Sequence, residues 1–166
     1  MEDTERLSNA KQMAKKYMRA SMLTGIIPVP VVDLVALSGV QLRMLQKLTQ
    51  LYEIPFSKNV GKSVISALLG GILPTYATAG VAGSLAKVVP LGGTATGMMT
   101  MSVFGGASTY ALSKVFIQHF ESGGTLLTFD PNKVKEYFAD QFKRGKEQVK
   151  AQQESEASEK AKTYTY

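Results

Sequence analysis

Between Lys62 and Lys114 the chain carries one charged residue, Lys87, and this gap limits the possible folds more than any other feature. A surface in water carries charged side chains every few residues, so the two uncharged runs must be covered by protein or by lipid. The runs are residues 63–86, which number 24, and residues 88–113, which number 26. As a helix, each is long enough to cross roughly 30 Å of hydrocarbon.

Small residues recur at every fourth position within both runs. The helix-packing residues that this spacing indicates are Gly71, Ala79, Gly83, Gly93, Gly97 and Gly105. Small residues on one helical face let two backbones approach closely, which is the packing mode typical of membrane helices. We therefore predict a Gly/Ala-rich helical hairpin over about residues 63–113. Two alternatives stay open: the hairpin inserts into a membrane as transmembrane helices, or it is buried in a soluble bundle, where Pro74 and Pro90 end short helices.

The segments on either side of the hairpin also have helical patterns. The N-terminal segment suits a short amphipathic helix, and a stripe of leucines at helical spacing follows an elbow that contains Pro28 and Pro30. Gly123 ends the helix after the second run, and Asp130 followed by Pro131 predicts the start of another. We therefore predict an all-α helical bundle.

The expected bundle is one domain over residues 1–150. The tail at residues 151–166 is polar and low in bulky apolar residues, a composition that favours disorder.

The excess of positive charge indicates the kind of partner. The chain has 19 Lys and Arg against 13 Asp and Glu, a formal net charge of +6. The basic residues flank an apolar centre, which favours an anionic lipid membrane over nucleic acid as the partner. Those expected to face lipid are Lys58, Lys62, Lys114, Lys143 and Lys146. Because cytoplasmic segments are enriched in Lys and Arg, their position predicts that both termini face the cytoplasm.

Motifs of enzyme chemistry are incomplete in this sequence. The string N-V-G-K-S at residues 59–63 ends like a phosphate-binding loop, but Phe56 stands where that loop needs its first glycine. The chain has no cysteine and one histidine, His119, for which no partner nucleophile can be placed. Asp33 is an isolated carboxylate in the first turn of a predicted helix, a position that the helix dipole explains. We predict a protein that is not an enzyme, with no catalytic residue, metal or cofactor.

Two elements of the sequence are specific enough to compare with known families. One is the P-x-P-x-x-D motif of Pro28, Pro30 and Asp33, and the other is S-K-V-F-I-Q-H-F-E-S-G-G at residues 113–124. With these elements, about residues 17–145 resemble the YcjF-like family of bacterial proteins of unknown function. The resemblance implies a bacterial, membrane-associated helical protein, located at the inner membrane or, alternatively, in the cytoplasm.

Members of that family occur alone or attached to small GTPase-like domains. This chain has no such domain, so the resemblance implies that any nucleotide role comes from a partner.

Two main hypotheses about function follow. In the first, the chain is a non-enzymatic membrane-associated protein that forms a homo-oligomer through its glycine-rich helix faces. In the second, it is a soluble helical module that docks on a GTPase-like partner. The partner-binding groove of the second hypothesis consists of Leu45, Leu48, Tyr137, Phe138 and Phe142.

Overall fold

A computed structural model of the chain describes residues 3–24, 30–76 and 93–163. Within these ranges it contains five helices and no strand, which confirms the predicted all-α class. The helices are α1 (Asp3–Thr24), α2 (Pro30–Leu51), α3 (Lys58–Tyr76), α5 (Gly93–Glu121) and α6 (Pro131–Thr163).

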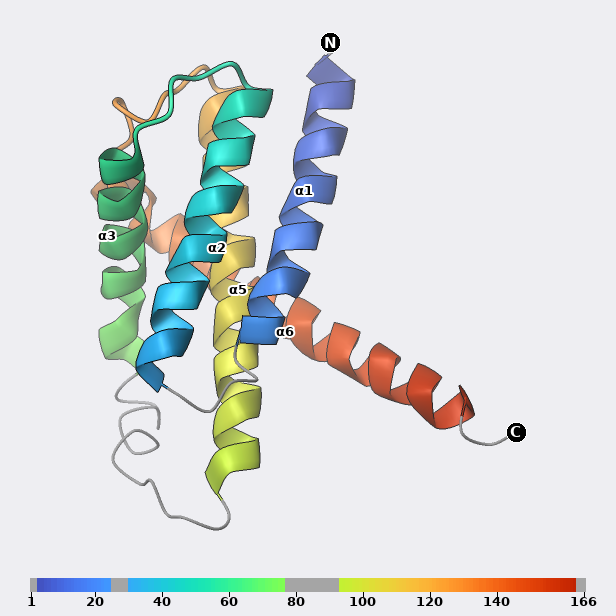
Figure 1. The fold of residues 1–166 in the computed structure, drawn as a ribbon. Helices are drawn as coiled ribbons and strands as arrows, with labels where there is room; N and C mark the ends of the chain where they lie inside the picture. The colour runs from blue at the N-terminus through green and yellow to red at the C-terminus, as the bar shows by residue number, and fades with distance from the viewer. Residues whose placement is uncertain (1–2, 25–29, 77–92, 164–166) are drawn as a thin grey trace.

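The helices form a bundle in which α5 is central. Figure 1 shows α1, α2, α3 and α5 running up and down along one common direction, while α6 crosses the bundle behind them. Helix α5 packs against α1, α2 and α6, and α2 also packs against α1 and α3. Since α5 touches three other helices, most of its circumference is covered by protein.

Local sequence explains where the helices begin and end. Helix α6 begins at Pro131, and Asp130 caps it because its Oδ1 accepts a hydrogen bond of 3.0 Å from the backbone N–H of Asn132. Helix α5 ends at Glu121, and Gly123 then adopts a φ of 78°, which glycine tolerates better than other residues. Both of these helix ends were predicted from the sequence and are confirmed.

The core lies where the apolar faces of all five helices meet. Its largest fully buried apolar side chains are Phe116, Phe138, Phe142, Met44, Leu45, Leu48 and Leu112. Phe116 is in contact with Phe120 and Phe129 through its ring, and these contacts fix the C-terminal end of α5 against the segment that leads to α6.

The two arms of the predicted hairpin do not use each other as main packing partners. Helix α3 packs mainly on α2 and α6, and α5 mainly on α1, α6 and α2. In the parts of the uncharged runs whose side chains are described, residues 63–72 and 101–113, every large apolar residue is buried or half-buried in the bundle. Within the described ranges, none of the helices has the length and hydropathy that crossing a membrane requires.

Glycine does allow close helix crossings, but between other helices than expected. A Cβ added at Gly105 would lie 2.6 Å from the carbonyl oxygen of Ser21 on α1. A Cβ at Gly145 of α6 would lie 2.8 Å from the carbonyl oxygen of Ala107 on α5. The close approach that small residues permit therefore joins α5 to α1 and to α6.

The other predicted helix-packing residues are not seen at a close helix crossing in the described part of the chain. The nearest neighbour of Gly71 is the side chain of Lys135 on α6, 3.3 Å from an added Cβ. Ala79 and Gly83 lie outside the described residues, and Gly93 and Gly97 belong to the first turns of α5, where side chains are not described.

The C-terminal tail differs from its predicted disorder. Helix α6 continues past residue 150 to Thr163, because Ala, Gln, Glu and Lys, which make up most of this stretch, favour helix even where no core is available. Residues 154–159 are exposed, and Figure 1 shows this end of α6 extending away from the other helices.

The crossing of α1 and α5 predicts opposite effects for matched Gly→Ala variants. Gly39→Ala and Gly70→Ala, whose added Cβ would meet nothing within 4 Å, should stabilise the helices by about 0.5–1 kcal/mol. Gly105→Ala should instead lower the free energy of unfolding by about 1–3 kcal/mol, because the methyl group meets a backbone carbonyl. Urea unfolding followed by circular dichroism measures all three. Equal stabilities of Gly105→Ala and Gly39→Ala would contradict the crossing.

Candidate functional site

Charged residues are distributed unevenly along the bundle axis. One end, which we call the charged end, collects the helix termini at Asp3, Leu51, Lys58 and Glu121. The other, which we call the apolar end, collects the termini at Thr24, Pro30 and Tyr76, and α5 extends beyond them to its own start at Gly93. In the sequence that approaches the apolar end, Asp33 is the one charge in residues 20–42 and Lys87 the one charge in residues 63–113.

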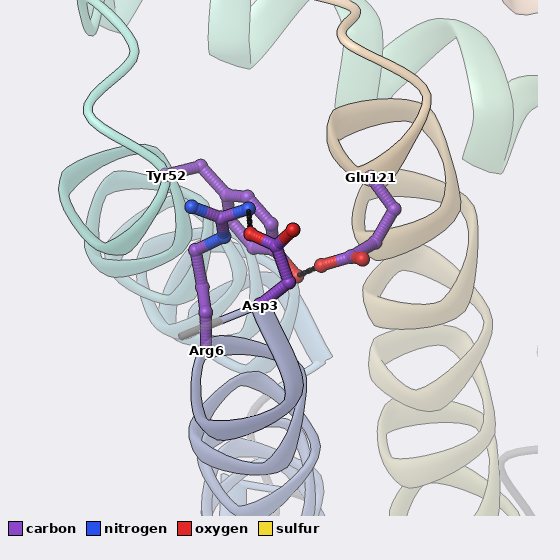
Figure 2. A network of polar contacts seen from close by, with 4 residues as sticks. All are labelled: Asp3, Arg6, Tyr52 and Glu121. Carbon is purple, nitrogen blue, oxygen red and sulfur yellow. Dashed lines mark hydrogen bonds and ion pairs between the residues drawn. The ribbon is translucent and has the colours of Figure 1, made fainter. Parts of the chain in front are cut away.

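A polar network joins three helices at the charged end (Figure 2). Arg6 pairs with Asp3 on α1, and its guanidinium lies 5.3 Å from the centre of the Tyr52 ring just after α2. The Tyr52 hydroxyl donates a hydrogen bond of 2.5 Å to Glu121 at the end of α5. Partial burial, and next the hydrogen bond to Glu121, raise the pKa of Tyr52 above its ordinary value.

The apolar end exposes two large aliphatic side chains. Leu23, in the last turn of α1, is 65% exposed, and Val35, in the second turn of α2, is 70% exposed. A cation borders the first of them, since Arg19 is exposed one helical turn before Leu23. An apolar side chain bordered by a cation suits contact with an apolar medium that has an anionic surface.

A fully buried polar cluster lies where α1, α2 and α5 meet. Gln41 Nε2 donates hydrogen bonds to Ser108 Oγ at 3.0 Å and to Thr109 Oγ1 at 3.3 Å. The Thr109 hydroxyl donates in turn to Ser21 Oγ at 2.7 Å, next to the close crossing at Gly105. These groups are hydroxyls and an amide, so the cluster contains no titratable side chain for acid–base chemistry.

Two open hollows flank α2 on the bundle surface. The first, about 360 Å³, is lined by Asn9, Gln12, Met13, Lys16, Tyr17 and Lys47. The second, about 300 Å³, is lined by Gly39, Leu42, Arg43, Gln46, Phe56 and Lys58. Each hollow has two cations and no carboxylate in its lining, so both suit an acidic surface more than an apolar ligand.

The residues that resembled enzyme motifs in the sequence make contacts that support the fold. His119 Nε2 lies 2.9 Å from the carbonyl oxygen of Thr125, and its ring meets that of Phe129 edge-on at 5.0 Å. Gly61 lies in the first turn of α3, where it packs near Leu42 and Leu45, so residues 59–63 form helix rather than a loop around a phosphate. The side chain of Asp33 lies outside the described residues.

The acidic and imidazole side chains of the described residues are also dispersed. Nowhere in the described part of the chain do three or more His, Cys, Asp or Glu side chains gather in a way that would hold a metal ion.

The five predicted lipid-facing lysines do not share one face. Lys58 and Lys62 are exposed in the first turns of α3, at the charged end. Lys114 is half-buried, with its Nζ 5.4 Å from the centre of the Tyr110 ring. On α6, Lys143 is exposed and Lys146 is half-buried. Lys146 lies one turn before Val149, which packs on Met22 near the apolar end. Of the five lysines, Lys146 is thus the one positioned near the end of α1.

The predicted partner-binding groove is wrong for most of its residues. Leu45, Leu48, Phe138 and Phe142 are at most 1% exposed, and all four belong to the core. Tyr137 alone of that set is accessible, at 37%. The two apolar stripes that suggested a groove are covered by the other helices of the bundle. Sequence reasoning did not single out Leu23 and Val35, although both lie in the sparsely charged residues 20–42.

Comparison with known proteins identifies a matching family and a relative of this chain. The family model described as "Domain of unknown function (DUF697)" matches residues 2–147. "Magnetosome membrane protein 22" of Magnetospirillum gryphiswaldense is 40% identical over 151 residues, which cover 89% of this chain and 77% of that protein. No solved structure matches the chain. The prediction of a family of unknown function is confirmed, because DUF697 is such a family. The YcjF name stays a prediction.

The network at the charged end predicts a pH dependence of stability. The Tyr52 pKa is higher in the folded than in the unfolded chain, where it is about 10. Stabilisation by the neutral phenol is therefore complete below about pH 10 and is lost as the pH rises further. Above pH 10 the free energy of unfolding should fall more steeply for the wild type than for Tyr52→Phe, with Glu121→Gln in between. Equal slopes in chemical unfolding at pH 9–11 would refute this assignment.

Proposed function

The chain belongs to the DUF697 family, and we propose that it is a non-enzymatic, membrane-associated helical protein that assembles with copies of itself. The observation that carries the membrane part is the 40% identity, over 89% of this chain, with a protein named as a magnetosome membrane protein. The long stretch with Lys87 as its one charge supports the same proposal from the sequence.

The proposed membrane is the bacterial inner membrane, and its anionic lipids are the proposed partner. The charged end, where α1 begins, carries the ionic network and the lysines of α3, and an aqueous phase suits such groups. The excess of Lys and Arg outside the uncharged runs supports a cytoplasmic location for both termini. A cytoplasmic protein that is recruited to membranes is the alternative.

Self-assembly is proposed through glycines that the described packing has not already occupied. Gly105 and Gly145 contact α1 and α5 within the chain, so they are poor candidates for contact with a second copy. Gly93 and Gly97 have the four-residue spacing that favours close helix pairs and lie in the first turns of α5.

The chemistry of the polar groups supports a role without catalysis. The buried cluster of Gln41 consists of amide and hydroxyl groups, and His119 is engaged with the backbone of Thr125. Neither arrangement pairs a nucleophile with a base. In this proposal the protein uses no cofactor and acts through its surfaces.

A second candidate function is docking on an acidic, GTPase-like protein. The observation that favours it is the pair of hollows beside α2, with two cations each and no carboxylate in their linings. Leu45→Asp is unsuitable as a test because Leu45 is fully buried. Arg43→Glu with Lys47→Glu should abolish capture of a nucleotide-binding partner, whereas Lys143→Glu on α6 should not.

The membrane proposal predicts how the intact chain fractionates. Expressed in bacteria, it should sediment with membranes, and its response to alkaline carbonate separates integral from surface-bound protein. It should also float with vesicles that contain phosphatidylglycerol, because the net charge of +6 attracts anionic lipid. Protein that is found in the cytosol from the start and fails to float with these vesicles would overturn the proposal.

Self-assembly predicts a separate outcome for matched glycine variants. Gly97→Leu should reduce chemical cross-linking between copies at least several-fold, because the larger side chain blocks close helix contact. Gly70→Leu, in open space on α3, is the control and should cross-link like the wild type. Unchanged cross-linking of both variants would contradict assembly through Gly97.

A further inference from the structure

One face of the bundle, centred on α2, collects positive charge. Figure 1 shows α1 and α3 on either side of α2, and one hollow lies along each of these two boundaries. The cations that line the two hollows are Lys16, Arg43, Lys47 and Lys58. We call these four residues the basic surface.

The carboxylates of the three helices lie away from the basic surface. Asp3 and Glu5 are in the first turn of α1, and Asp33 is in the first turn of α2. Glu53 follows the end of α2, and the sequence of α3 contains no Asp or Glu. Since no carboxylate lines either hollow, the positive charge of the basic surface is not balanced locally.

The distal part of α6 carries the opposite charge. Val149 is the last buried residue of this helix among those whose side chains are described, and α6 continues to Thr163. We call residues 151–163 the arm. The middle of the arm, residues 151–159, has no Lys or Arg and three carboxylates, which are Glu154, Glu156 and Glu159. The nearest cations on α6 flank this stretch and are Lys150, Lys160 and Lys162.

The arm points away from the basic surface of its own chain. Helix α6 is unbroken from Pro131 to Thr163, and Figure 1 shows its C-terminal end extending away from the other helices. From Val149 to Thr163 the helix rises about 20 Å. A single helix of this length is marginally stable in water without a packing partner. A partner that covers the arm therefore has to come from another molecule.

The two opposite charges on one chain decide which molecule this is. Anionic lipid would attract the basic surface but repel the carboxylates of the arm. An acidic protein of another kind would likewise match the basic surface alone. A second copy matches both, because it brings an acidic arm to the basic surface and a basic surface to the arm.

The spacing of the charges agrees with a contact between two helices. Arg43 and Lys47 are four residues apart on α2, about 6 Å along its axis. Glu156 and Glu159 are three residues apart on α6, about 4.5 Å along its axis. Each pair thus spans about one helical turn, so two helices side by side can bring both carboxylates to both cations.

From these observations we propose that the acidic arm of one copy docks on the basic surface of a second copy, with Glu156 and Glu159 facing Arg43 and Lys47. This inference rests on the proposed self-assembly and adds a charged contact to the glycine contact at Gly97.

Charge reversal on the full-length chain tests both sides of the contact. Arg43→Glu with Lys47→Glu, or Glu156→Lys with Glu159→Lys, should each weaken self-association in sedimentation velocity about tenfold, because like charges then meet. The chain that carries all four substitutions should associate like the wild type again. Circular dichroism checks that each variant remains helical.

Two matched variants control for the change in net charge. Lys133→Glu with Lys143→Glu makes the same change as reversal of the basic surface, and Glu136→Lys with Glu147→Lys makes the same change as reversal of the arm. All four of these residues are exposed on α6 outside the two contact surfaces. Both controls should associate like the wild type.

Disulfide formation gives a second test, since the natural chain has no cysteine. Gln50→Cys is exposed on α2 one turn after Lys47, and Ser155→Cys is exposed on the arm. Oxidation of a mixture of these two chains should give several-fold more mixed disulfide than a mixture of Ser155→Cys with Lys143→Cys. The yield should fall several-fold in about 1 M salt, where the Debye length is only about 3 Å.

The outcomes separate this inference from the proposed function. If charge reversal leaves self-association unchanged while Gly97→Leu reduces it, the charged contact is wrong and the proposed self-assembly stands. If both reversals weaken association but the fourfold variant does not restore it, the two surfaces do not meet and the inference is overturned. If reversal of the basic surface lowers only flotation with phosphatidylglycerol vesicles, lipid occupies this surface and the inference is again overturned. If the wild type stays monomeric with and without vesicles, both proposals fail.

Discussion

The close crossing of α5 with α1 and α6 is the contact on which the rest of the fold depends. Gly105 and Gly145 bring backbone against backbone, because a Cβ at either position would approach a carbonyl oxygen to within 2.8 Å. At this separation the hydroxyl of Thr109 reaches Ser21, and Gln41 reaches Thr109 from α2. A wider spacing would break these hydrogen bonds between buried groups, which is costly. The register of three helices therefore follows from glycine and from one polar cluster.

The sequence predicted helices and several of their ends well, because those depend on nearby residues. Proline, glycine and a capping aspartate act within one turn, so the starts and stops at Asp130 and Gly123 could be inferred directly. The partners of the glycine faces could not be inferred. A small-residue spacing tells which face of a helix can approach another closely, but nothing in the spacing of Gly105 indicates that α1 is the neighbour.

The same limit explains the error over the partner-binding groove and the two missed residues. An apolar stripe such as that of Leu45 and Leu48 looks alike whether another helix of the chain or another protein covers it. Its burial follows only from the arrangement of all the helices. Leu23 and Val35 show the reverse case, since single aliphatic residues in apolar surroundings give no sign in the sequence that the fold leaves them exposed.

The scarcity of charge from residue 63 to residue 113 has two physical solutions in this molecule, one observed and one proposed. For the described side chains of α5, the amphipathic helices α1 and α6 supply the cover that lipid would give a membrane helix, and they present their polar faces outward. The part of this cover that α1 supplies ends where α1 ends, beside Leu23. A membrane at that end would continue the apolar surroundings without a break.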